Sequence, residues 1–222
     1  MARINPMFAV PSLLIDHPDH GELNRALRQL FLAREGQEHY GNPGATMKIN
    51  PGLFESTFRL FDWSEPCIAR LRDFCWSTLY GLIGELNGYD TEVLRRLHIN
   101  ADAWFHVTRK GGYFGIHNHP MASWSGVYCV DDGGDSEAHP ESGMLNFQHP
   151  NPMSAMYLDM AAANLRPPYS TAGRMFRLRP GQLIIFPSWL LHQVMPFHGP
   201  GERITVAFNA WFRLEGAMPS KK

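Results

Sequence analysis

The chain has 222 residues, of which 44% are hydrophobic, and this is enough apolar material for one packed domain. A formal net charge of -1 leaves no basic excess to bind nucleic acid or a membrane surface, so we expect neither as a partner. Three cysteines without CxxC spacing argue against a disulfide framework and for a reducing compartment. The N-terminal residues lack a long apolar run, so we expect no signal peptide or membrane span and a cytoplasmic location.

The first half of the chain is predicted to be mainly helical. Leu23, Leu27, Leu30 and Phe31 recur at helical spacing, and a second, longer apolar stripe ends at the pair Asn87-Gly88. The predicted elements are a strand at 7–15, helices at 20–34, 66–86 and 91–97, and a loop at 36–52 with a short strand at 46–49.

After His98 the pattern changes to many short strands separated by Gly, Pro, Asp and Asn, which favours a sandwich or barrel. We therefore expect an α+β fold in one domain, 1–222, with residues 1–97 as helical support and 98–213 as the β core. The predicted strands cover 103–107, 115–119, 123–130, 144–147, 175–178, 182–186 and 203–211.

Two long connections interrupt these strands, at residues 131–143 and 150–174. Loops of that length inside a compact domain are usually functional or disordered. We predict that residues 150–174 form a mobile lid over the mouth of the β core, because they join two strands of the site-bearing sheets.

Histidines supply the clearest chemical signal. His117 and His119 lie two positions apart in GIHNHP, so on a strand both imidazoles would project from the same face. Two neutral imidazoles form a natural chelate for a divalent metal, and His192 in FPSWLLHQVMPF can supply a third ligand from another strand. A His-x-His pair is weak evidence by itself, and His106 is expected to be a core residue or a supporting one.

The strand RITVAFNAW strengthens the argument. Arg203, Thr205 and Asn209 share one of its faces, while the other face is apolar and suited to packing. An arginine that points into a β core is costly unless it meets an anion, and its planar fork suits a carboxylate. Tyr128, on the strand SGVYCV, is a further candidate for the lining of the pocket.

The stretches HNHP, SGVY, FPSWLLH and RITVAFN, in this order, resemble the 2-oxoglutarate- and Fe(II)-dependent dioxygenases. More narrowly, they look like a bacterial and phage family of 2OG-Fe(II) oxygenases that is distantly similar to prolyl 4-hydroxylases. The resemblance implies a double-stranded β-helix, a jelly roll like that of the cupins, with the helices packed on one sheet. It also implies Fe(II) as the metal and 2-oxoglutarate as the co-substrate.

The resemblance assigns roles to individual residues. His117 and His192 match the two metal histidines, and Arg203 matches the residue that pairs with the distal carboxylate of 2-oxoglutarate, with Thr205 as a hydroxyl partner. Asn209 faces the same way as Arg203 and is expected to contact the co-substrate, while Tyr128 is expected either to line this pocket or to pack in the core. His119 stands where the family usually has Asp or Glu. We favour a three-histidine iron site, in which these ligands are also the catalytic centre; alternatively Asp131 or Asp132 completes the ligand set, or the position is open.

Two other classes of function remain open from the sequence. The first is a 2-oxoglutarate-independent dioxygenase with three histidine ligands, resembling the thiol dioxygenases of the cupin fold. The second is a protein that binds a metal or small ligand without catalysis. Neither the primary substrate, a small molecule or a peptide, nor the oligomeric state can be read from the sequence.

Overall fold

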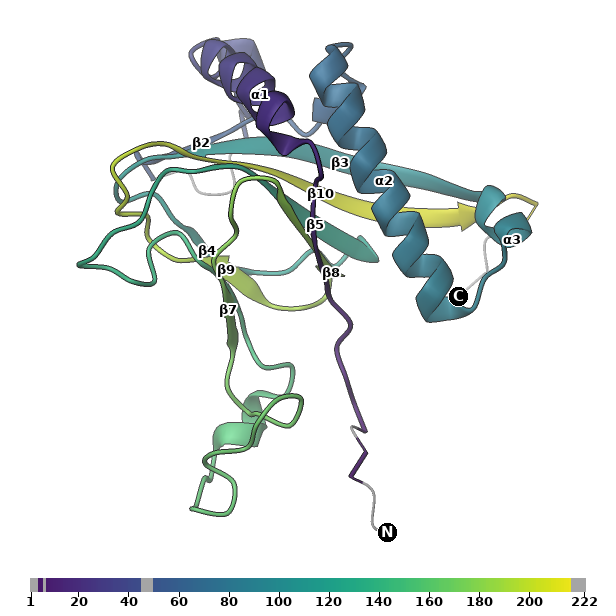
Figure 1. The fold of residues 1–222 in the computed structure, drawn as a ribbon, viewed down its shortest axis with the longest axis vertical. Coiled ribbons are helices and arrows are strands. Elements are labelled where there is room, and N and C mark those ends of the chain that lie inside the picture. The colour runs from purple at the N-terminus through teal and green to yellow at the C-terminus, as the bar shows by residue number, and fades with distance from the viewer. Residues whose placement is uncertain (1–3, 6, 45–49, 217–222) are drawn as a thin grey trace.

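The computed structural model describes residues 4–5, 7–44 and 50–216 and consists of helices packed on two antiparallel sheets. The long helices lie on one face of the larger sheet, and the smaller sheet lies on its other side (Figure 1). This mixed arrangement confirms the α+β prediction. The strand expected at 46–49 falls outside the described residues. Within the described part, no helix has both the length and the apolar content to cross a membrane.

The helices form where the apolar periodicity predicts them. Leu23, Leu27 and Phe31 of the first long helix are fully buried against the larger sheet. The second long helix has a proline at its first turn and ends at Gly88, whose φ of 66° is the left-handed conformation that favours glycine. The helices are α1 (His20–Glu35), α2 (Pro66–Asn87) and α3 (Thr91–Arg95), with short 3-10 turns η1 (Glu38–Tyr40), η2 (Leu60–Asp62) and η3 (Pro152–Ala155).

The larger sheet has the strand order β1-β8-β5-β10-β3-β2, and every neighbouring pair is antiparallel. Its strands are β1 (Leu13–Asp16), β2 (Leu53–Glu55), β3 (Leu97–Thr108), β5 (Trp124–Asp132), β8 (Gln182–Pro187) and β10 (Arg203–Leu214). The smaller sheet has the order β4-β9-β6-β7, built from β4 (Phe114–His117), β6 (Leu145–Phe147), β7 (Arg174–Phe176) and β9 (His192–Val194).

Strand alternation divides the interior into two compartments. On β10, Ile204, Val206 and Phe208 belong to the apolar core under the helices, and Arg203 and Thr205 point to the other side. A second, smaller apolar cluster fills the space between the two sheets. The cavity that carries the polar residues therefore lies between the sheets, where both walls are held by hydrogen-bonded strands.

Candidate metal centre

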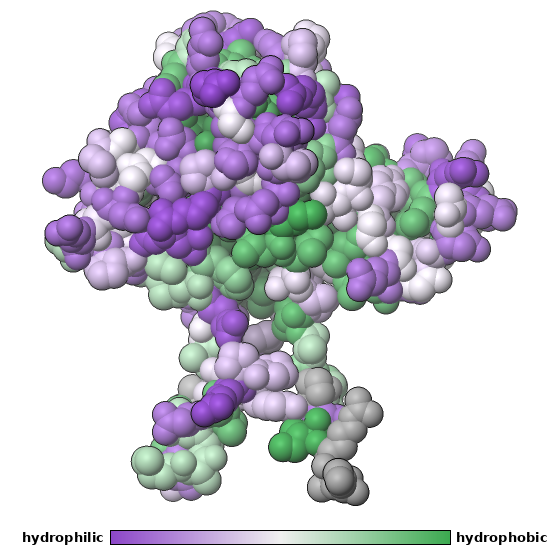
Figure 2. Space-filling model, in the orientation of Figure 1, coloured by the Kyte–Doolittle hydropathy of each residue, from purple (hydrophilic) through white to green (hydrophobic). Residues whose placement is uncertain are grey.

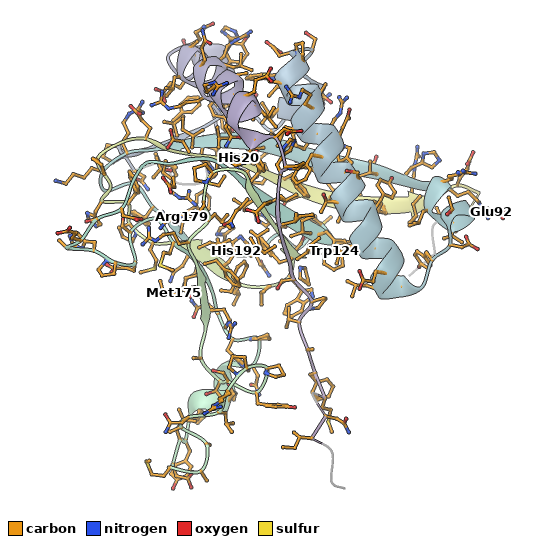
Figure 3. The ribbon with its side chains drawn as sticks, viewed as in Figure 1. His20, Glu92, Trp124, Met175, Arg179 and His192 are labelled. Atoms are coloured by element: carbon orange, nitrogen blue, oxygen red, sulfur yellow. The ribbon has the colours of Figure 1, made fainter. Side chains whose placement is uncertain are left out.

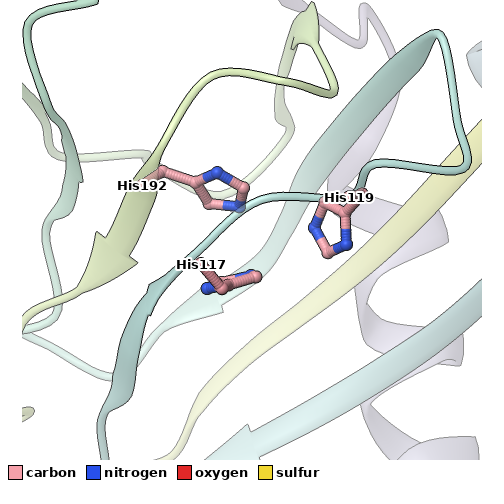
Figure 4. Close-up of side chains that lie close together, drawn as sticks. All are labelled: His117, His119 and His192. Atoms are coloured by element: carbon pink, nitrogen blue, oxygen red, sulfur yellow. The ribbon is translucent and has the colours of Figure 1, made fainter.

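Three histidines converge at the inner face of the smaller sheet. Each of His117, His119 and His192 offers one ring nitrogen, and these three atoms lie within 4.8 Å of one another. The ring centroids of His117 and His192 are 4.2 Å apart, and the ring of His119 lies 4.9 Å from the first and 5.3 Å from the second. The rings point toward a common space (Figure 4), and His192 occupies the centre of the molecule (Figure 3). Three imidazoles at this spacing suit a first-row divalent metal.

The positions of His117 and His192 follow from strand pairing. They are direct partners across β4 and β9, and each donates a hydrogen bond from Nδ1 to a backbone carbonyl two residues earlier, Gly115 O and Leu190 O, at 2.8 Å. Because a carbonyl oxygen only accepts, Nδ1 carries the proton in both rings. The lone pair is then on Nε2, which is the atom left for a metal.

His119 reaches the cluster by another route than we predicted. The strand β4 ends at His117, so His119 does not share a strand face with it. Instead His119 lies in the turn that follows, where its backbone N–H donates to Ser188 O at 2.9 Å. The Ser188 hydroxyl in turn lies 2.8 Å from that of Ser125. His117 and His119 are thus brought together as predicted, but His119 is positioned by this turn and not by the alternation of side chains along a strand.

Burial keeps the three imidazoles neutral. Desolvation, together with the neighbouring histidines, lowers the pKa of His119 to about 4 and that of His192 to about 3. The pKa of His117 is also lowered, mainly by burial. Neutral rings with free lone pairs are the state that binds a metal, so the donor set fits Fe(II) at neutral pH.

Arg203, Thr205 and Asn209 line the same cavity as the three histidines, as the strand pattern predicted. The Arg203 side chain is almost fully buried, and among the described residues it has neither a hydrogen bond nor an ion pair. Burial lowers the pKa of Arg203, yet a guanidinium stays charged in proteins. A buried cation that forms no ion pair and opens on a cavity can bind an anion.

Asn209 has a structural partner that the sequence did not reveal. Its Oδ1 accepts a hydrogen bond from the Ser125 hydroxyl at 2.7 Å, and Ser125 also contacts Ser188. Asn209 is thus connected through these serines to the turn that holds His119. Its amide nitrogen remains available to the cavity.

Gly143 makes room for Arg203. It has a φ of 63°, and a Cβ placed there would lie 2.9 Å from Arg203 Cδ and 3.1 Å from the ring of Phe197. Both the backbone conformation and the close approach therefore require glycine. The sequence contains no signal that could have linked this loop residue to the arginine.

Tyr128 is not part of the cavity, and its prediction as a co-substrate residue was wrong. It lies on the helix side of β5, fully buried in the apolar core, and its hydroxyl donates to Asn24 Oδ1 at 2.7 Å. Both faces of β5 are buried, so the alternation of apolar residues could not distinguish the cavity face from the core face.

The two aspartates considered as alternative ligands also lie elsewhere. Asp131 forms an ion pair with Arg28 at 2.9 Å, and Asp132 forms one with Arg179, also at 2.9 Å. Among the described residues, the cluster of potential ligands contains histidines alone. This geometry favours the three-histidine interpretation over an aspartate ligand.

The segment predicted as a lid lies away from the cavity. Between β6 and β7 the chain projects from the body beside the N-terminal segment (Figure 1), and apolar surface is exposed where these projections begin (Figure 2). Residues from 7–12, 147–151 and 167–174 enclose a separate cavity of about 720 Å³. The two cavities share the ring of Phe186, which lies 4.9 Å from that of His192. No described residue of 150–174 lines the histidine cavity.

Comparisons with known proteins agree with this site. Residues 102–209 match the model of a family described as "Putative 2OG-Fe(II) oxygenase", and this stretch carries the three histidines and Arg203. No curated protein matches the chain.

Solved structures match it over nearly its whole length. A prolyl-4-hydroxylase from Pseudomonas putida has a TM-score of 0.58 at 17% identity, covering 93% of this chain and 94% of that one. AviO1 from Streptomyces viridochromogenes has a TM-score of 0.58 at 15% identity, covering 96% and 94%. HygX from Streptomyces hygroscopicus, with nickel, 2-oxoglutarate and hygromycin B bound, has a TM-score of 0.56 at 13% identity, covering 96% and 86%. At these identities the structures show a shared fold, and over residues 102–209 the chain is similar to the family of 2OG-Fe(II) oxygenases.

Proposed function

We propose that this chain is a hydroxylase that holds Fe(II) through His117, His119 and His192 and binds 2-oxoglutarate through Arg203. The observation that carries the proposal is a cluster of three neutral imidazoles in the same cavity as a buried arginine that forms no ion pair with a described residue. We also propose that the two sheets form the double-stranded β-helix that the sequence resemblance implies.

The residues of the chain have separate tasks in this mechanism. The histidines fix the metal on one wall, while Arg203 and Thr205 on β10 hold the distal carboxylate on the opposite wall. Apolar side chains of Leu145 and Phe186 line the space between and exclude water. When bound, Fe(II) allows O₂ to decarboxylate 2-oxoglutarate to succinate and CO₂ and to deliver one oxygen atom to a C–H bond of the substrate.

Three neutral ligands leave the metal with one more positive charge than two histidines and a carboxylate would. This charge favours an anionic chelating co-substrate, which is consistent with 2-oxoglutarate. The same charge is consistent with a second candidate function. This is a three-histidine dioxygenase that needs no 2-oxoglutarate and binds the carboxylate of its substrate through Arg203.

One pair of measurements tests the proposal. The metal content of the purified protein is determined first, and 2-oxoglutarate is then titrated calorimetrically into the Mn(II)-loaded protein without oxygen. We expect about one metal ion per chain and binding that disappears when the metal is removed. With Fe(II) and O₂, slow formation of succinate is expected even without substrate. A metal-loaded protein that neither binds nor consumes 2-oxoglutarate would favour the second candidate.

The substrate class is proposed from the neighbours and from the second cavity. HygX was solved with hygromycin B, and a prolyl hydroxylase from Trichoplax adhaerens was solved with a peptide fragment, so this fold accepts both small molecules and peptides. The 720 Å³ cavity beside Phe186 is lined largely by aromatic, aliphatic and proline side chains. We propose that the substrate approaches from this side and presents an apolar portion to it.

A further inference from the structure

His106 lies on the floor of the cavity among polar neighbours. It is on the cavity face of β3, and the sheet register places Thr205 of β10 directly beside it on one side and Glu55 of β2 on the other. Only 12% of its side chain is exposed. An imidazole in this position is either a packed core residue or a binding residue, and its hydrogen bonds distinguish the two.

One nitrogen of the His106 ring is occupied. Its Nε2 lies 3.2 Å from Nε1 of Trp104 and 3.1 Å from Oε2 of Glu55. The indole N–H of Trp104 can only donate, so Nε2 must accept in the state that satisfies the indole. The proton of a neutral ring is then on Nδ1. A neutral ring that instead donated from Nε2 to Glu55 would have its lone pair on Nδ1, so the donor on the cavity side belongs to the tautomer that accepts from Trp104.

The other nitrogen opens on the cavity. Among the described residues, Nδ1 of His106 has no hydrogen-bond partner. Every fully buried side-chain nitrogen or oxygen in the described part of the chain does have such a partner. Nδ1 must therefore be accessible, and the cavity is the space that the residue lines. The same reasoning applies to the guanidinium of Arg203, so two donors open on one cavity beside the hydroxyl of Thr205.

We propose that His106 is a further binding residue, which donates from Nδ1 to the distal carboxylate of 2-oxoglutarate together with Arg203 and Thr205. This inference rests on the proposed function. Trp104 and Glu55 orient the ring so that its donor faces the ligand. The buried histidine thereby completes a set of donors for an anion that a lone arginine would hold less specifically.

The test compares two variants of matched shape. His106→Leu removes the donor, while His106→Asn keeps an amide nitrogen close to the position of Nδ1. Calorimetric titration of 2-oxoglutarate into the Mn(II)-loaded, oxygen-free protein should show an affinity lower by about 10- to 100-fold for His106→Leu, the effect of one hydrogen bond to a charged group. We expect the His106→Asn affinity to stay within about threefold of the wild-type value.

A second ligand separates binding from a structural role. 2-Oxobutyrate has the same chelating end as 2-oxoglutarate but no distal carboxylate, so His106→Leu should bind it as weakly as the wild type does. Mn(II) affinity should be the same in all three proteins. An equal loss of affinity for both ligands, or an unchanged affinity for 2-oxoglutarate in His106→Leu, would overturn the proposal.

The outcomes also distinguish this proposal from the function on which it rests. If the wild type binds 2-oxoglutarate and Arg203→Ala abolishes that binding while His106→Leu does not weaken it, the function holds and the role of His106 is refuted. If the wild type binds no 2-oxoglutarate, the proposed function itself fails.

Discussion

Replacement of His119 by alanine tests the metal centre most directly. The ring of His119 has no hydrogen bond to a described residue, and the turn around it is held by the bond from its backbone N–H to Ser188. Truncation at Cβ should therefore remove a metal ligand while leaving the backbone bond and the turn intact. The loss of metal can then be attributed to the ligand rather than to misfolding.

The expected loss of affinity is large. Removal of a residue that only supports a ligand typically weakens metal binding by 10- to 100-fold, so loss of one of three ligands should cost at least about 100-fold, or about 2.7 kcal/mol. His117→Ala and His192→Ala should lose metal to a similar extent. His119→Asp, which places a carboxylate at the position usual in the family, should retain the metal.

Iron content after anaerobic reconstitution and desalting provides the assay, and competition with a chelator gives the affinity. Asn118→Ala is the matched control, because Asn118 precedes His119 in the same turn but its side chain contacts Trp189 O at 3.3 Å and not the cluster. Full iron occupancy in His119→Ala would refute the three-histidine site.

Three further predictions follow from the same structure. Arg203→Ala should weaken 2-oxoglutarate binding by about 30-fold to several thousandfold while the metal content is unchanged. Calorimetry on the Mn(II)-loaded variant measures this affinity, and a wild-type value would contradict the role assigned to Arg203. Tyr128→Phe removes the bond to Asn24 in the core, so denaturant unfolding should show a loss of about 1–2 kcal/mol, with 2-oxoglutarate affinity unaffected; weaker binding without a stability change would restore Tyr128 to the site. In the metal-free protein, the pKa values of His119 and His192 lie at about 4 and about 3, below the ordinary 6.5, so the unfolded chain binds more protons. The free energy of unfolding should therefore be highest above pH 6.5 and should decrease as the pH falls toward 3. Over this range the melting temperature of His192→Gln should decrease less steeply than that of the wild type.

Local patterns in the sequence determined the helices and the faces of β10. The spacing of Leu23, Leu27 and Phe31 defined the buried stripe of α1 because a helix repeats every 3.6 residues. Alternation separated Arg203 and Thr205 from the apolar face of β10 because only one face of that strand meets the helix-side core. The family resemblance rested on motifs that lie in the strands carrying the site or directly beside them.

Tertiary structure decided which of these residues meet. His119 lies beyond the end of β4, and the carbonyl of Ser188, far along the chain, fixes its position. Tyr128 was misplaced because both faces of β5 are buried, so alternation had no polar face to mark the cavity. The donor on His106 depends on Trp104 of its own strand and Glu55 of a neighbouring one. Hydrophobic periodicity and secondary-structure propensity are properties of a single segment of the chain. The direction in which a hydrogen-bond donor points into a cavity depends instead on the pairing of segments that are far apart in the sequence.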